Sequence, residues 1–251
     1  MTPGSVVVGY LDDGGWRACF GLSYRDLIMH DVLNSGRIVR ENGRELRQVC
    51  GTGGIVAGRN RVAKDFLDNT DGEYLFFVDT DMGFAADTVD RLVKACDRIS
   101  SPVVGGLCFK LSRKRDRGDY YAERYSIAPT IYEYLELDDE VGFRPMADYP
   151  RDSMTKCAGT GAACIIIHRN ALVKLRKAYG DVWFDPITHP LGYKGQPRTF
   201  SEDLSFCVRC HAQDLPVYVH TGIKTCHDKH GVFLDEAAYD AQRAVRETVE
   251  A

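Results

Sequence analysis

Short apolar runs and longer stretches with helical spacing alternate along the chain. The apolar runs bounded by glycine or charged residues are typical of buried strands, which we expect at residues 5–9, 74–78, 102–109, 162–168 and 216–221. Apolar residues at three- and four-residue steps predict amphipathic helices at residues 23–33, 59–67, 87–99, 170–179, 202–213 and 235–251. Because strands alternate with helices, the pattern predicts an α/β fold with a mainly parallel sheet flanked by helices.

Two stretches without a periodic pattern, 111–120 and 185–200, predict long loops with a functional role. The first is dense in Arg and Lys and runs into tyrosines, so it could grip a polyanionic acceptor such as DNA, stack on sugars, or be merely solvated. The second is punctuated by glycine and proline. We expect the 251 residues to form one domain, because α/β domains of this size commonly fold as one unit.

Composition narrows the function classes. A formal net charge of -4 gives no chain-wide basic surface for nucleic acid. No apolar run approaches the roughly 20 residues of a membrane span, and no basic-then-apolar leader opens the chain. The nine cysteines lie mostly inside apolar elements, as reduced thiols do. We therefore expect a cytoplasmic protein with no membrane span.

The strongest chemical signal is Asp79-Thr80-Asp81, directly after the apolar run 74–78. Residues i and i+2 of an extended chain point to the same side, so both carboxylates can converge at the carboxyl end of a buried strand. Open α/β sheets bind ligands at that end, and paired carboxylates suit Mg²⁺ or Mn²⁺ bridging nucleotide phosphates. The alternative is that Asp79 caps a turn and Asp81 is solvated.

Two predicted helix starts carry further candidates. Glu202 and Asp203 follow Ser201 in a first turn, where the helix dipole favours carboxylates. They could be ordinary capping residues, or Asp203 could act as a general base. Arg59 begins another predicted helix, whose exposed N–H groups favour anions, so it could meet a pyrophosphate. Otherwise it is a surface arginine paired with a nearby aspartate.

The sequence matches other known nucleotide-binding and metal-binding motifs only in part. The glycine-rich stretch 53–58 resembles the start of a P-loop, but Arg59-Asn60 replaces the required Lys-Ser/Thr. No G-x-G-x-x-G follows a predicted strand, which disfavours a dinucleotide oxidoreductase. The C-x-x-C of Cys207 and Cys210 could contribute to a zinc site, but it lies inside a predicted helix and no second C-x-x-C exists.

In their order and spacing these motifs resemble GT-A glycosyltransferases, especially the family 2-like enzymes of bacteria and phages. The run YLFFVDTDMGF is similar to their D-x-D segment. The other similar segments are Arg59-Asn60 (their A-R-N), Gly159-Thr160-Gly161 (their acceptor-side G-x-G), Ser201-Glu202-Asp203-Leu204 (their E-D motif) and Cys226-His227 (their late histidine). The resemblance covers roughly residues 5–230. It departs at Val8-Gly9-Tyr10-Leu11, where the usual segment is Pro-x-Tyr-Asn.

The resemblance implies a GT-A-like fold with a donor nucleotide-binding half at 1–110, an acceptor half at 111–234 and a peripheral C-terminal helix at 235–251. It implies Mn²⁺ or Mg²⁺ held by Asp79, Asp81 and His227, with His230 competing for the histidine role. The residues implied to bind the UDP- or GDP-sugar donor are Gly9, Tyr10, Arg59, Asn60 and Asp79.

The implied reaction is sugar transfer to a hydroxyl of a glycan, a protein or, least favoured, DNA, by a hexosyltransferase-type enzyme. Glu202 would bind the acceptor, and Asp203 would be the base of an inverting displacement. A retaining reaction on the same scaffold remains open if Asp203 is not behind the anomeric carbon. A nucleotidyltransferase and a non-catalytic nucleotide- or carbohydrate-binding module also remain open.

Overall fold

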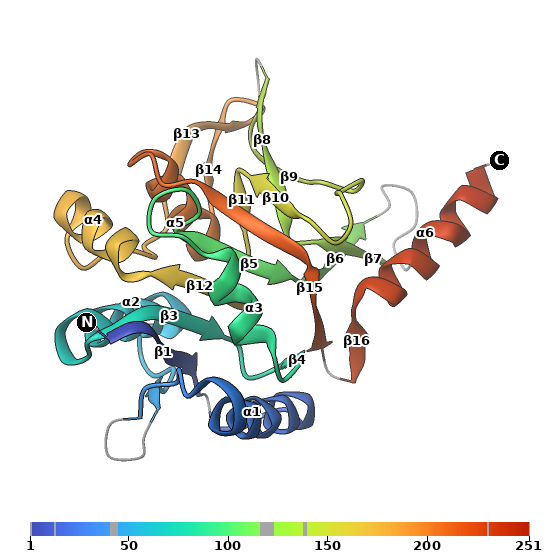
Figure 1. Ribbon diagram of the computed structural model, residues 1–251. Helices are drawn as coiled ribbons and strands as arrows, with labels where there is room; N and C mark the ends of the chain where they lie inside the picture. Colours follow the sequence, from blue (N-terminus) through green and yellow to red (C-terminus); the bar gives the residue numbers. More distant parts are fainter. Residues whose placement is uncertain are drawn as a thin grey trace.

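The computed structural model describes residues 2–12, 14–40, 45–115, 123–137, 140–229 and 231–250. A curled central sheet with the order β10-β15-β5-β12-β3-β1-β2 runs through the middle of the molecule, with α1 (Ala18–His30) on one side of it (Figure 1). Its strands are β1 (Thr2–Leu11), β2 (Leu46–Gln48), β3 (Gly72–Val78), β5 (Val103–Leu107), β10 (Met154–Cys157), β12 (Cys164–His168) and β15 (Val217–Lys229). β1, β2, β3, β5 and β15 run in one direction, whereas β12 and β10 run in the opposite one.

Each face of this sheet buries its own core. In β3, Leu75 and Phe77 belong to one core and Phe76 and Val78 to the other, because successive side chains of a strand point to opposite faces. The first core is covered by α2 (Gly54–Asn69), α4 (Arg169–Tyr179) and α5 (Glu202–His211). The second is covered by α1 (Ala18–His30), which continues into the π-helical turn η1 (Asp31–Ser35), and by α3 (Thr88–Ala95). The predicted α/β class with a mostly parallel, helix-flanked sheet is confirmed.

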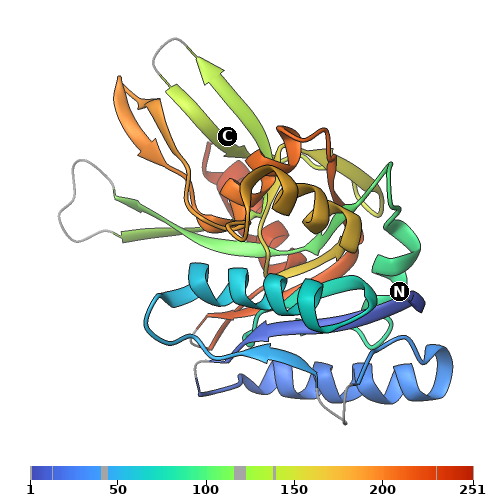
Figure 2. The same ribbon diagram turned by 90° about the vertical axis from the view of Figure 1, so that its left-hand side faces the viewer.

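Three hairpins extend from one side of the central sheet (Figure 2). They are β6 (Phe109–Arg115) with β7 (Glu123–Pro129), β8 (Ile131–Leu137) with β9 (Glu140–Pro145), and β13 (Thr188–Tyr193) with β14 (Gln196–Thr199). The last two hairpins join with β11 (Gly159–Thr160) in a second sheet of order β11-β8-β9-β13-β14.

Where the structure describes them, the two predicted long loops are mostly strand. Residues 111–115 continue β6, and residues 116–122 lie outside the described part of the chain. The 185–200 stretch is mostly the β13–β14 hairpin, in which His189 pairs with Arg198. Lys194 and Gly195 turn the chain with φ of 49° and 71°. Glycine and proline in this stretch form the turn and the register shift of the hairpin. They interrupt the alternation of apolar and polar residues by which a strand is predicted from sequence.

Some predicted element boundaries also differ. α1 begins at Ala18, before the expected Ser23, whose hydroxyl instead accepts a hydrogen bond from Phe84 N at 2.9 Å. α2 begins at Gly54 and α3 ends at Ala95. β15 runs on to Lys229, and its second half pairs with the short strands β4 (Met82–Phe84) and β16 (Val232–Leu234). The segment after residue 221 is thus a strand.

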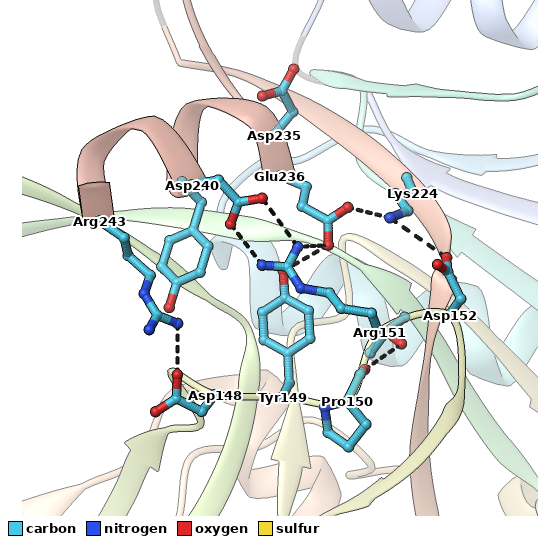
Figure 3. Close-up of polar contacts among 12 residues, drawn as sticks. Asp148, Tyr149, Pro150, Arg151, Asp152, Lys224, Asp235, Glu236, Asp240 and Arg243 are labelled. Carbon is cyan, nitrogen blue, oxygen red and sulfur yellow. Dashed lines mark hydrogen bonds and ion pairs between the residues drawn. The ribbon is translucent and has the colours of Figure 1, made fainter. Parts of the chain in front are cut away.

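The C-terminal helix α6 (Glu236–Glu250) is fixed by a cluster of polar contacts (Figure 3). Glu236 accepts hydrogen bonds from Tyr149 Oη at 2.9 Å and from Arg151, and it pairs with Lys224 on β15. Arg151 also pairs with Asp240 at 2.6 Å. These contacts tie α6 to β15 and to the segment before β10. Across the described ranges, no helix is both long and apolar enough to cross a membrane.

Candidate functional site

The candidate site lies where β3 ends and β12 begins. Because β12 is antiparallel to β3, its first residue, Cys164, pairs with Val78, the last residue of β3. Asp79 N then donates a hydrogen bond to Ala163 O at 2.9 Å. The predicted D-x-D segment and the Gly159-Thr160-Gly161 segment are therefore neighbours at one edge of the sheet.

Asp81 and His227 are brought together by the second half of β15. His227 pairs with Met82 of β4, and Asp228 N donates to Asp81 O at 2.9 Å. His227 Nε2 consequently lies 3.1 Å from Asp81 Oδ2. His227 Nδ1 is 3.0 Å from Phe109 O, which can only accept, so the neutral ring carries its proton on Nδ1. The Nε2 lone pair is left available as a metal ligand.

Asp81 Oδ1 and His227 Nε2 are buried; within the described residues Oδ1 has no hydrogen-bond partner, and Nε2 faces its ion-pair partner, Asp81 Oδ2, at 3.1 Å. We call them the open ligand pair. Burial raises the pKa of Asp81, but the proximity and charge of His227 and Lys229 lower it to about 2, so the carboxylate is ionised. Burial lowers the pKa of His227, and Asp81 more than offsets this, so that the net shift is upward.

The open ligand pair fits a divalent cation. The carboxylate suits Mn²⁺ or Mg²⁺, and the imidazole beside it favours Mn²⁺ over Mg²⁺; diphosphate oxygens and water commonly complete such a site. In the part of the chain that is described, no group of three or more His, Cys, Asp or Glu side chains is arranged to hold a metal. Asp79, the third expected ligand, thus forms no such cluster with Asp81 and His227. His230, the competing histidine, lies outside the described residues.

Arg59 is buried and connects the two groups of acids. Its Nη2 donates to Asp79 Oδ1 at 2.9 Å, its Nη1 donates to Ala162 O at 3.2 Å, and its Nε lies 3.7 Å from Glu202 Oε1. Burial lowers the pKa of this guanidinium, but Asp79 and Glu202 raise it further, so it stays charged. The alternative of a surface arginine paired with a nearby aspartate is wrong, because only 2% of Arg59 is exposed.

Asn60, expected to bind the donor, has both side-chain polar atoms engaged within the protein. Its Nδ2 donates to Asp185 Oδ1 at 2.6 Å, and its Oδ1 accepts from Phe184 N at 2.8 Å. These bonds hold the segment that leads into β13. Asn60 therefore has a structural role next to the site.

Glu202 and Asp203 begin α5 beside the glycine segment. Asp203 Oδ1 accepts hydrogen bonds from Ser201 Oγ and from Leu204 N, the latter at 2.8 Å. Asp203 Oδ2 lies 3.6 Å from the position that a Cβ on Gly161 would occupy. The missing side chain leaves space next to this oxygen. Burial, and then the charge of Asp203, raise the pKa of Glu202 above its usual value.

Gly9 and Tyr10, expected at the nucleobase, lie in the protein interior. A Cβ on Gly9 would lie 2.6 Å from Val62 Cγ1, so glycine is needed for α2 to pack on β1. Tyr10 is 1% exposed, and its ring contacts Trp16 edge-on at 5.6 Å. Both residues therefore pack beneath the molecular surface against neighbouring side chains.

Two residues of the site were missed by the sequence analysis. Trp16 is 42% exposed, and its neighbour Arg17 donates a backbone hydrogen bond to Thr80 O at 3.0 Å, within the D-x-D segment. Lys229 Nζ lies 2.8 Å from Asp81 Oδ2. The sequence does contain a signal for each residue. Trp16 comes directly after the first glycine-rich turn, and Lys229 lies two residues after His227, which places both side chains on the same side of a strand.

The C-x-x-C considered as part of a zinc site belongs to the interior. Cys207 and Cys210 are fully buried thiols of α5, and Cys207 Sγ contacts Thr160 O at 3.7 Å. Burial raises the pKa of both thiols well above the usual range, which disfavours the thiolates that zinc requires.

No family model matches this chain, and no curated protein matches it. Among solved structures the chain is similar to the crystal structure of A197 from STIV, with 17% sequence identity and a TM-score of 0.48, over 93% of this chain and 91% of that one. These comparisons assign the chain to no family.

Proposed function

We propose that this protein is a metal-dependent glycosyltransferase that moves a sugar from UDP- or GDP-sugar to an acceptor hydroxyl. The observation that carries the proposal is the open ligand pair of Asp81 and His227 at the end of β3, linked through Asp79 and Arg59 to the acids of α5. A metal-dependent inverting transfer uses both parts, a cationic site for the departing diphosphate and a base for the incoming hydroxyl.

The donor would bind along the carboxyl ends of β1 and β3. Asp81 and His227 would hold Mn²⁺ or Mg²⁺, which would neutralise the charge of the departing diphosphate. Arg59 holds Oδ1 of Asp79, which orients that carboxylate for the ribose or the cation. Trp16 would stack on the nucleobase, because its exposed ring lies on a rigid aromatic base of Tyr10 and Phe20.

The acceptor would bind beside Gly161. Asp203 Oδ2 would take the proton of the acceptor hydroxyl as its oxygen bonds to the anomeric carbon. The bond from that carbon to the diphosphate breaks, and its electron pair leaves with the nucleoside diphosphate. Attack opposite the leaving group gives inversion. Glu202, held by Arg59, would position the acceptor.

The direct test is release of nucleoside diphosphate. The protein is incubated with a panel of UDP- and GDP-sugars, Mn²⁺ and candidate acceptors, and free UDP or GDP is measured. We expect release with at least one donor, and none with EDTA. Release of pyrophosphate from a nucleoside triphosphate and a sugar phosphate would indicate a nucleotidyltransferase instead. Nucleotide binding without turnover across the panel would indicate a binding module.

The nucleobase contact gives a separate prediction. Trp16→Ala should weaken UDP or GDP binding in the presence of Mn²⁺ by about 5- to 150-fold, since stacking on an aromatic ring contributes roughly 1–3 kcal/mol. Trp16→Phe keeps a stacking ring and should retain most of the affinity. The Kd values would be measured by titration calorimetry. Equal affinity of the alanine variant and the parent would remove Trp16 from the donor site.

A further inference from the structure

Lys229 brings a positive charge of the chain itself into the proposed cation site. Its Nζ lies 2.8 Å from Asp81 Oδ2, and His227 Nε2 approaches the same oxygen at 3.1 Å. The Lys229 side chain is 40% exposed and that of Asp81 25%, so the ammonium reaches the carboxylate from the solvent side. The ammonium therefore occupies one oxygen of the carboxylate that would hold a divalent cation.

The backbone of Lys229 is held in place. β15 pairs with β16 through Lys229 and Val232, and with β4 through His227 and Met82. A change at this site is therefore a rotation of the lysine side chain, whose flexible four-carbon stem allows the ammonium to move by several ångströms without the strand. Because His227 and Lys229 lie two residues apart on one strand, they point to the same side and share Asp81.

We propose that Lys229 competes with the divalent cation for Asp81 and thereby couples cation binding to donor binding. In the free protein the ammonium occupies Asp81 Oδ2 and lowers the affinity for the cation. A bound diphosphate offers the ammonium another anion, so Lys229 turns from Asp81 to the phosphates and leaves the carboxylate to the cation. The inference rests on the proposed function, since it needs a diphosphate ligand next to Asp81.

The coupling is reciprocal. If nucleotide raises the affinity for the cation by some factor, the cation raises the affinity for nucleotide by the same factor. The arrangement favours a protein that takes up the cation together with its donor, and it disfavours a cation held permanently.

Mn²⁺ binding measured by the electron paramagnetic resonance signal of free Mn²⁺ tests the inference without any turnover. Lys229→Met should bind Mn²⁺ roughly three- to tenfold more tightly than the parent in the absence of nucleotide, because a repelling unit charge on a partly exposed side chain is removed. Addition of UDP or GDP should raise the Mn²⁺ affinity of this variant by a smaller factor than that of the parent. Lys229→Arg, which keeps the charge, should behave like the parent.

The matched control is Lys156→Met, which removes the charge of an exposed lysine on β10 and should leave Mn²⁺ affinity unchanged. The parent should bind Mn²⁺ better than Asp81→Ala does. If it does so but Lys229→Met binds Mn²⁺ no more tightly than the parent, the role of Lys229 is overturned and the cation site stands. A parent that binds Mn²⁺ no better than Asp81→Ala would overturn the cation site itself, and the role of Lys229 with it.

Discussion

Asp81→Ala should abolish both cation binding and sugar transfer. The substitution removes one member of the open ligand pair and leaves His227 alone with Lys229, so the charge of the leaving diphosphate is no longer neutralised. We expect transfer to fall by about 10³-fold or more, equivalent to about 4 kcal/mol in the transition state. Transfer rate and Mn²⁺ binding would be measured on the same preparation. In the parent, EDTA should have the same effect, and added Mn²⁺ or Mg²⁺ should reverse it.

The control for this substitution is Asp26→Ala, which removes a surface aspartate on α1 whose side chain is 51% exposed. It should leave transfer and cation binding at parental levels. Thermal unfolding of both variants would verify that the fold survives. Transfer at the parental rate in the presence of a chelator would contradict the assignment of a metal to Asp81 and His227.

Asp203→Asn should reduce transfer by about 10²- to 10⁴-fold, the usual contribution of a positioned general base. Nucleotide affinity should be close to that of the parent, because Asp203 lies beside Gly161, where we propose that the acceptor binds. Asparagine has nearly the same size, and its amide oxygen can still accept the hydrogen bond from Leu204 N, so the start of α5 should be kept. Transfer rate and nucleotide affinity, measured on the same variant, distinguish a role of Asp203 as the base from a role in donor binding.

Two other outcomes would reassign Asp203. Transfer at near-parental rate would make it a structural residue at the helix start. Glu202 would then be the next candidate base, since burial and the charge of Asp203 raise its pKa toward the range in which a base operates. Loss of nucleotide binding together with transfer would move Asp203 to the donor side.

Local patterns in the sequence were sufficient to predict the class of the fold and the place of the D-x-D segment. The apolar run before Asp79 is buried as β3, and the acids after it lie at the carboxyl end of that strand. The start of α5 at Glu202 also agrees with its predicted boundary. Each of these features depends on a few consecutive residues, which is why they can be read from the chain alone.

Features that depend on pairing between distant strands could not be predicted. The continuation of β15 to Lys229 comes from its pairing with β4 and β16, because residues 222–229 show no strict alternation of their own. The sequence around Arg59 indicates only a surface or phosphate-facing residue, because its buried position depends on carboxylates far away in the chain. The β13–β14 hairpin was hidden by the glycine and proline residues of its turn and register shift.

The pairing of Val78 with Cys164 also determines when the protein can fold during synthesis. β3 and β12 are neighbours in the sheet although β4 through β11 lie between them in the chain. Until β12 has left the ribosome, β3 keeps an unpaired edge, which is a surface prone to aggregation. Sheets closed by such distant pairings form slowly. We therefore expect the candidate site to assemble late, only after β15, which completes it, has left the ribosome.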